Sequence, residues 1–249
     1  MSATYTANRK PIPILVYHQI ASAPPKGSPF RSLYVAPEAF SRQMAWLKLL
    51  GYTGLSMSAL QPYLLGGKRG KVVGITFDDG YLNNLLNALP VLIKQGFSST
   101  CYAVSDLLGK SNLWDESLGI VQTPLMNEVH IRQWTAAGQE IGSHTRRHID
   151  LTTADDQECR HEMGLGKTEL ESVTALPVDH FCYPYGHYDA KHTAIASELG
   201  FVTATTTQRS RCHAQTDLLQ LPRVPVLRST SLPVFWLKIA TDYEDRRKK

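Results

Sequence analysis

Short apolar segments alternate with amphipathic ones along nearly the whole of this chain, and this alternation limits the fold more than any other feature. The apolar segments predict strands at residues 14–17, 71–77, 99–104, 140–143, 181–183, 202–205 and 221–226. The segments between them predict helices at residues 37–50, 84–95, 128–137, 155–173, 191–199 and 233–241. Strands and helices that alternate at this pace are typical of βαβ units around a parallel sheet.

The length of the chain fits one domain of this class. It has 249 residues, of which 43% are hydrophobic, and single α/β barrels routinely occupy about 200–250 residues. We find no internal repeat, low-complexity block or linker in the sequence. Residues 107–127 lack a clear period and predict a long loop on the active face. We therefore expect one domain over residues 1–249.

Charge and cysteine content exclude several classes of protein. The formal net charge is +4, and the basic residues are scattered apart from a short run at 246–249, which we interpret as a solvated chain end. This pattern does not predict a nucleic-acid partner, which would need clustered basic residues with interleaved aromatics. Four cysteines without a C-x-x-C pair predict reduced thiols.

The first ten residues contain no apolar segment of the kind found in signal peptides. No apolar run approaches the roughly 18 residues that span a bilayer. We therefore expect a cytoplasmic protein by default, and an exported form whose leader was trimmed remains an alternative.

The most informative polar segment is residues 76–80 (TFDDG), at the end of a predicted strand. Two adjacent carboxylates are costly to bury there, because each charge must be desolvated. In a regular strand Asp78 and Asp79 would point to opposite faces, but Gly80 allows the chain to turn so that both can address one centre. A divalent cation would compensate their charge. The alternative is an ordinary surface turn.

A second polar segment, residues 143–148 (SHTRRH), follows the strand predicted at 140–143. Histidines four apart, such as His144 and His148, would lie on one face of a helical turn with their imidazoles directed at one metal. They would share with Asp79 the end of the sheet at which the chemistry of parallel α/β folds collects. One carboxylate and two imidazoles with open positions are the ligand set of a catalytic zinc site.

The third polar segment is residues 181–186 (FCYPYG). Pro184 and Gly186 favour a sharp turn at the end of a strand, which can direct a backbone N–H towards the site. Such a donor would stabilise a developing oxyanion. An aromatic turn packed on the core is the alternative.

With these three segments in this order, the chain closely resembles the polysaccharide deacetylases, a group of carbohydrate esterases that act on chitin, peptidoglycan and poly-N-acetylglucosamine. The resemblance extends from residues 15–18 (LVYH) to residues 221–223 (LPR) and rests on TFDDG, HTRRH and YPYG. It implies a (β/α) barrel of about seven strands, distorted from the regular form, with a metal in a groove at its top. The Tyr-His pair and the YPYG segment resemble the subgroup that acts on biofilm exopolysaccharides.

The resemblance also implies roles for individual residues. Asp79, His144 and His148 would bind one divalent metal ion, with zinc as the first choice and cobalt or nickel as alternatives. Asp78 would be the general base. The backbone N–H of Tyr185 would stabilise the oxyanion.

Two positions depart from the family pattern. Many members have an arginine where this chain has Phe181 or Cys182, and we expect Arg223 to replace it by pairing with Asp78 and keeping it ionised. Many also have a leucine-x-histidine motif near the C-terminus that supplies the general acid. The matching residues 219–223 (LQLPR) contain no histidine.

We expect His18 to take over as the general acid. It follows the strand predicted at residues 14–17, and a closed barrel brings the first strand beside the last. A histidine side chain can donate a proton to a departing amine. The alternatives are that His18 only packs under the first loop, and that His213, His187 or water is the acid.

Together these features predict a metal-dependent hydrolase that removes N-acetyl groups from amino sugars in a glycan and releases acetate. An N-acetylated glycan or oligosaccharide is the expected partner. The same site could act on another amide or on an O-acetyl ester, and a glycan-binding module with an inactive site is a third possibility. The oligomeric state stays open.

Overall fold

In the computed structural model, which describes residues 10–247, parallel strands close into a barrel of seven. They follow one another in the order β1, β10, β9, β8, β7, β6, β5, and β1 pairs with β5 to complete the ring. Their bounds are β1 Ile14–Tyr17, β5 Val72–Phe77, β6 Thr100–Ala103, β7 Glu140–Ser143, β8 His180–Cys182, β9 Thr203–Arg209 and β10 Leu221–Pro225. The predicted (β/α) barrel of about seven strands is confirmed.

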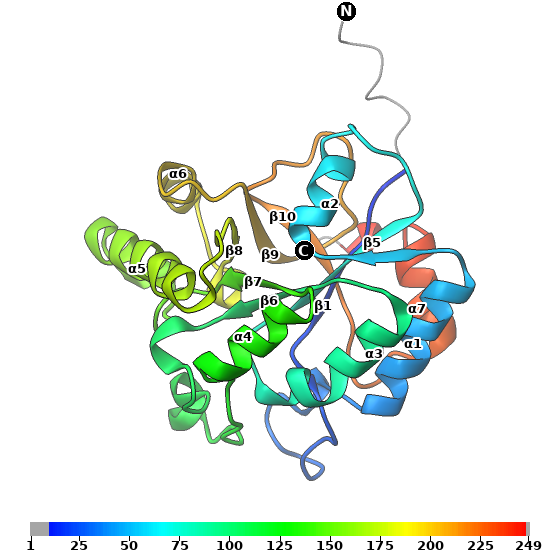
Figure 1. The fold of residues 1–249 in the computed structure, drawn as a ribbon, viewed down its shortest axis with the longest axis horizontal. Helices are drawn as coiled ribbons and strands as arrows, with labels where there is room; N and C mark the ends of the chain where they lie inside the picture. The colour runs from blue at the N-terminus through cyan, green and yellow to red at the C-terminus, as the bar shows by residue number, and fades with distance from the viewer. Residues whose placement is uncertain (1–9, 248–249) are drawn as a thin grey trace, which may run out of the picture.

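Helices surround the strands, as Figure 1 shows. The six predicted helices are present as α1 Pro37–Leu49, α3 Leu89–Gln95, α4 Glu128–Ala136, α5 Asp156–Thr174, α6 Ala190–Glu198 and α7 Leu232–Ala240. The segment predicted as one helix at 84–95 begins with a π-helical turn, Asn84–Ala88, before α3. Pro37 is the first residue of α1, where its missing N–H leaves no helical hydrogen bond unmade.

Some short elements were not predicted. The strand β4 (Thr53–Leu55) pairs with the first half of β5, and the helix α2 (Met57–Leu64) follows it directly. Pro62 lies inside α2, and a proline at that point of the sequence argues against a helix. The two-residue strands β2 (Gln19–Ile20) and β3 (Tyr34–Val35) are too short to show a period.

One apolar cluster fills the interior of the barrel. It contains Ile14, Tyr102, Cys182 and Leu221, which come from four different strands, together with Met57 and other residues of α2. Since β1 and β10 begin at two of these residues, α2 packs against the interior at the end where the strands start. That end is filled by side chains, so the opposite end is free to hold a site.

A second cluster joins the outside of the barrel to α1, α3 and α4. Its centre is aromatic: the rings of Tyr17, Phe40 and Phe77 lie within 5.1–5.8 Å of one another, and Trp134 meets Phe77 edge-on. These side chains pack β1 and β5 against the surrounding helices. The two strands carry the polar residues described below.

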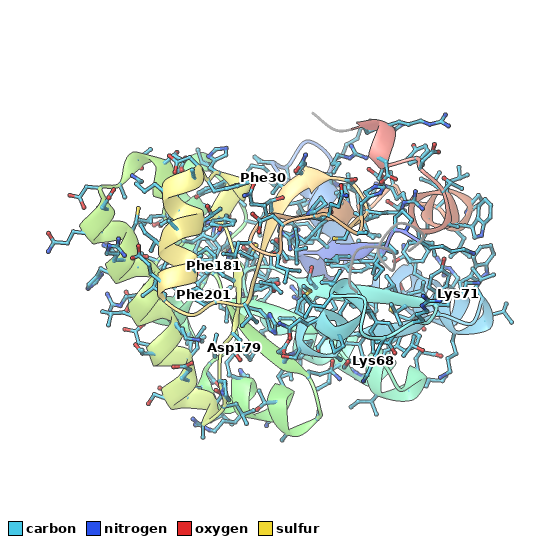
Figure 2. The ribbon with its side chains drawn as sticks, turned by 90° about the horizontal axis from the view of Figure 1, so that it is seen from above. Phe30, Lys68, Lys71, Asp179, Phe181 and Phe201 are labelled. Carbon is cyan, nitrogen blue, oxygen red and sulfur yellow. The ribbon has the colours of Figure 1, made fainter. Side chains whose placement is uncertain are left out.

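The two ends of the barrel can be followed in Figure 2. Lys71 and Asp179, which directly precede β5 and β8, lie lower in the view than Phe30, which is near its top. In the part of the chain that the structure describes, no helix is long and apolar enough to cross a membrane. The basic run at 246–249 lies partly outside the described residues; within them, Arg246 pairs with Asp242. The first nine residues also lie outside, so the expectation for the N-terminus stays a prediction.

Replacing Trp134 by alanine should destabilise the fold. Its ring is fully buried and its indole N–H donates to the carbonyl of Glu140 at 3.0 Å. Removal of a buried aromatic side chain costs about 3–5 kcal/mol of unfolding free energy. Denaturant titration measures the loss, with Trp236→Ala as the control because Trp236 is 41% exposed. Equal losses in the two variants would contradict the packing described here.

Candidate metal centre

The polar motifs meet at the end of the barrel where the strands finish. They surround a cavity of about 250 Å³. Asp78 and Asp79 follow β5, His144 follows β7 and His18 follows β1. The predicted site residues that line this cavity are His18, Asp78, Asp79, His144, His148 and Tyr185. Arg223, within β10, lies beneath them and is fully buried.

The turn after β5 directs both carboxylates towards this cavity. The turn begins one residue earlier than the position of Gly80 suggested, since Asp79 itself has a φ of 72° and Gly80 a φ of 76°. Aspartate tolerates this left-handed conformation better than most residues. Because two successive residues leave the extended strand, Asp78 and Asp79 no longer point to opposite faces.

The prediction that His144 and His148 share a helical turn was wrong. Residues 144–148 form an irregular loop, in which Thr145 and His148 have φ values of 63° and 61°. The N–H of His148 donates to the hydroxyl of Thr145 at 2.9 Å. The loop still brings the two rings together, with centroids 4.7 Å apart. Spacing in the sequence therefore identified the pair but not the backbone that makes it converge.

The three candidate ligands lie at distances that suit one small cation. Nε2 of His144 and Nε2 of His148 each lie 3.4 Å from the same oxygen of Asp79. A tetrahedral site with metal–ligand bonds of ~2.1 Å separates its ligand atoms by about 3.4 Å. Nδ1 of His144 lies 2.8 Å from the carbonyl oxygen of Cys182. A proton on Nδ1 donates to that carbonyl and leaves Nε2 free as a ligand.

The charges around the three residues also suit a cation. Burial raises the pKa of Asp79, but hydrogen bonds from His144 and His148 outweigh it and hold the pKa well below its usual value. Burial lowers the pKa of His148, which favours the neutral ring. Burial also lowers the pKa of His144, yet the neighbouring Cys182 and Asp79 raise it well above normal. A cation must therefore displace a proton from His144, so its affinity should fall as the pH falls.

Asp78 is held by a buried ion pair. The guanidinium of Arg223 donates to both of its carboxylate oxygens, at 2.6 and 2.7 Å. Burial raises the pKa of Asp78, but the charge and hydrogen bonds of Arg223 outweigh it and the pKa lies below its usual value. The expected contact between Arg223 and Asp78 is therefore present. The guanidinium also lies 3.3 Å from Sγ of Cys182, in the segment where many family members have their arginine.

The three histidines considered as the acid lie in different surroundings. Nε2 of His18 is 3.9 Å from Asp78, and its side chain is 27% exposed at the cavity. His213 lies near Asp245, at 3.4 Å, with its side chain 47% exposed. His187 contacts Asp150 at 2.8 Å. Neither of these two lines the cavity.

The turn after β8 has the sharp backbone expected of YPYG. Tyr185 has a φ of 59° and Gly186 a φ of 73°. A Cβ at Gly186 would lie 1.9 Å from the hydroxyl oxygen of Thr207, so a side chain cannot be accommodated there. The ring of Tyr185 meets that of His148 edge-on at 4.7 Å. The turn therefore packs directly against a candidate ligand.

Several residues that line the cavity were not predicted, among them Tyr34, Tyr81, Trp114 and Asp115. Tyr81, directly after TFDDG, lines the cavity, and burial and the charge of Asp79 raise the pKa of its hydroxyl. Trp114 stacks on the ring of His148 at 4.4 Å, and Asp115 and Tyr34 line the cavity wall. The only signal in the sequence was the aperiodic segment 107–127, which was expected on this face and does supply Trp114 and Asp115.

Comparison with known proteins agrees with this geometry. The family model described as polysaccharide deacetylase matches residues 66–204, more than half of the chain. The chain belongs to the polysaccharide deacetylase family. Its relative YxkH of Bacillus subtilis, whose name assigns it provisionally to the same family, is 29% identical over 218 residues, covering 86% of this chain and 71% of YxkH.

Solved structures of similar proteins cover nearly the whole barrel. The deacetylase PplD of Streptococcus pyogenes, solved in complex with acetate, has a TM-score of 0.82 and 26% identity, covering 93% of this chain and 99% of PplD. The polysaccharide deacetylase BC0361 of Bacillus cereus has a TM-score of 0.78 and 28% identity, covering 92% and 69%. IcaB of Ammonifex degensii has a TM-score of 0.78 at 21% identity, covering 92% and 97%, and supports the fold.

Replacing Arg223 by methionine should raise the pKa of Asp78. The substitution removes the positive charge and leaves the buried carboxyl without its partner, and an opposite charge at this distance typically shifts a pKa by about 1–3 units. Carboxyl ¹³C NMR of the metal-free protein measures the titration. Arg223→Lys keeps the charge but loses the two-pronged contact, so its shift should be smaller. An unchanged pKa in Arg223→Met would contradict the assigned cause.

Proposed function

We propose that this protein is a metal-dependent deacetylase that removes N-acetyl groups from amino sugars within a glycan. The observation that carries this proposal is the pair of 3.4 Å contacts from His144 and His148 to one oxygen of Asp79. These contacts lie beside an ionised Asp78 in the cavity of a polysaccharide deacetylase family member. The acetate in the PplD structure is consistent with such a reaction.

Asp79, His144 and His148 would hold the metal. Two imidazole nitrogens, each 3.4 Å from the same carboxylate oxygen, favour zinc, and cobalt or nickel would accept the same ligands. When bound, the metal would acidify a water molecule and polarise the acetyl carbonyl. Because all three ligands are buried, few water molecules can compete with them for the metal.

Asp78 is the proposed general base. Its ion pair with Arg223 keeps the carboxylate ionised, so it can accept the proton of the attacking water. The backbone N–H of Tyr185 would donate to the oxyanion from the sharp turn at residues 184–186. Both residues line the cavity that contains the candidate ligands.

His18 is the proposed general acid. It reaches the cavity from β1, which pairs with β10 on one side and β5 on the other, so it stands between the strand of Arg223 and the strand of Asp78. Its partial exposure allows it to exchange protons with solvent. It would protonate the amine as the C–N bond breaks, and the products would be acetate and a free amino sugar.

The adjacent aspartates should respond differently to substitution. Asp79→Ala should lose both metal and activity, because it removes a ligand. Asp78→Asn should keep its metal while the rate falls by ~10²–10⁴, the usual contribution of general acid–base catalysis. Metal analysis and acetate release from N-acetylated oligosaccharides measure the two effects. Loss of metal in Asp78→Asn would show that the roles are reversed.

The same assay separates the rival functions. Acetate released from O-acetylated xylan but not from N-acetylated oligosaccharides would indicate an esterase. Binding of the oligosaccharides without acetate release by the zinc-loaded protein would indicate a binding module with an inactive site.

His18→Ala should keep its metal and lose most of kcat. The loss should be smaller for substrates with a better leaving group, since these need less protonation at the transition state. His213→Ala is the matched control, because His213 does not line the cavity. Near-normal kcat in His18→Ala would return the acid role to another histidine or to water.

A further inference from the structure

The buried carboxylate of Glu162 contacts the loop of residues 144–148, which contains two candidate metal ligands, and it has no role in the proposed mechanism. Glu162, on α5, is fully buried. One of its oxygens accepts hydrogen bonds from the backbone N–H groups of Arg146 and Arg147, at 3.1 and 2.8 Å. Its other oxygen accepts Nε of Arg147 at 2.6 Å. These two N–H groups lie between His144 and His148, so Glu162 binds the backbone that connects two candidate ligands.

Glu162 belongs to a face of α5 that is shaped to fit this loop. Gly166, one turn further along, approaches the loop so closely that a Cβ there would lie 3.0 Å from the carbonyl carbon of Thr145 and 3.2 Å from the nitrogen of Arg146. Glu169, on the same face, accepts Nε of Arg146 at 2.8 Å. A carboxylate, a glycine and a carboxylate at i, i+4 and i+7 therefore line the contact.

The loop is held from its other side as well. The backbone N–H of Asp106 donates to the carbonyl of Arg146 at 3.0 Å, and that of Ser105 donates to Thr145 at 3.4 Å. The hydroxyl of Ser105 donates to Glu169 at 2.5 Å, which closes the ring of contacts. The peptide groups between the two histidines thus have partners on α5 and on the turn after β6.

The burial of Glu162 and the backbone conformation of the loop are both energetically unfavourable. A fully buried carboxylate is unfavourable unless it is hydrogen-bonded and paired. The loop itself holds two non-glycine residues, Thr145 and His148, in the left-handed conformation, which is strained for residues that carry a side chain. The contacts with Glu162 offset this strain and replace the hydrogen bonds of the helical turn that the loop does not form.

We propose that Glu162, supported by the close approach of Gly166, is a positioning residue that holds the His144–His148 loop in its metal-binding conformation. The inference rests on the proposed function, since it assigns the loop to a bound metal. Glu162 lies behind the loop and does not line the cavity. Its effect should therefore appear in metal affinity before it appears in the chemical step.

The test measures zinc affinity of metal-free protein by competition with a chromophoric chelator. Glu162→Ala should raise the dissociation constant by about 10–100-fold, the usual effect of removing a group that orients a ligand. Glu162→Gln should show a smaller rise, because its amide oxygen can still accept the loop N–H groups. Activity at saturating zinc should recover in both variants, so the loss should lie in affinity and not in kcat.

Two matched controls separate positioning from general damage to α5. Glu158 contacts the same Arg147 at 3.1 Å but is exposed and does not contact the loop backbone, so Glu158→Gln should change the constant by less than about twofold. Gly166→Ala should weaken zinc binding, whereas Gly164→Ala should not, because its Cβ would meet only the side chain of Leu199. Circular dichroism shows whether each variant is folded. If Glu162→Ala does not fold, the zinc affinities of the single variants Glu162→Gln and Gly166→Ala test the positioning role.

The outcomes distinguish this inference from the proposed function. If the wild-type protein binds zinc and the Glu162 and Gly166 variants bind it equally well, the positioning role is overturned and the proposed function stands. If the wild-type protein binds no divalent metal, the proposed function fails and this inference fails with it. A fall in kcat at saturating zinc with unchanged affinity would also overturn the positioning role.

Discussion

The burial of two adjacent carboxylates at the end of β5 is the constraint on which the rest of the site depends. Asp78 and Asp79 are only 3% and 7% exposed, so each negative charge must be compensated inside the protein. Arg223 on β10 compensates the first, and the imidazoles after β7 face the second. The barrel is what makes this possible, because it brings strands from distant parts of the sequence around a single centre.

Backbone strain is concentrated at the same place. Asp79, Thr145, His148 and Tyr185 all have positive φ values, and each lies in or beside the candidate metal centre. Such conformations persist only where the surrounding structure enforces them. The buried carboxylate of Glu162 and the packed turn after β8 provide that enforcement. Rigid positioning of this kind suits a site whose ligands must converge within tenths of an ångström.

The fold was largely predictable from the sequence, because its main elements are long enough to show their period. The bounds of β1 and β7 were predicted to the residue, and α5 was displaced by one. The segment 53–64 was missed, since β4 has three residues and α2 contains Pro62. The site was predictable where residues lie within a motif or, like His18 and Arg223, at or near the end of a predicted strand. Trp114 and Tyr34 could not be assigned, because the loops that bring them to the cavity have no period.

Residue chemistry and order were therefore determined by the sequence: an aspartate pair after a strand, a histidine pair after another and a turn of tyrosine, proline and glycine. Tertiary structure alone decided how they meet. The contact between Arg223 and Asp78, 145 residues apart, was expected from the family resemblance and not from any local pattern. Nothing in the sequence indicated that the histidine loop rests on Glu162 and is not helical. Local sequence can specify backbone preferences within a few residues, whereas contacts between distant strands exist only once the barrel closes.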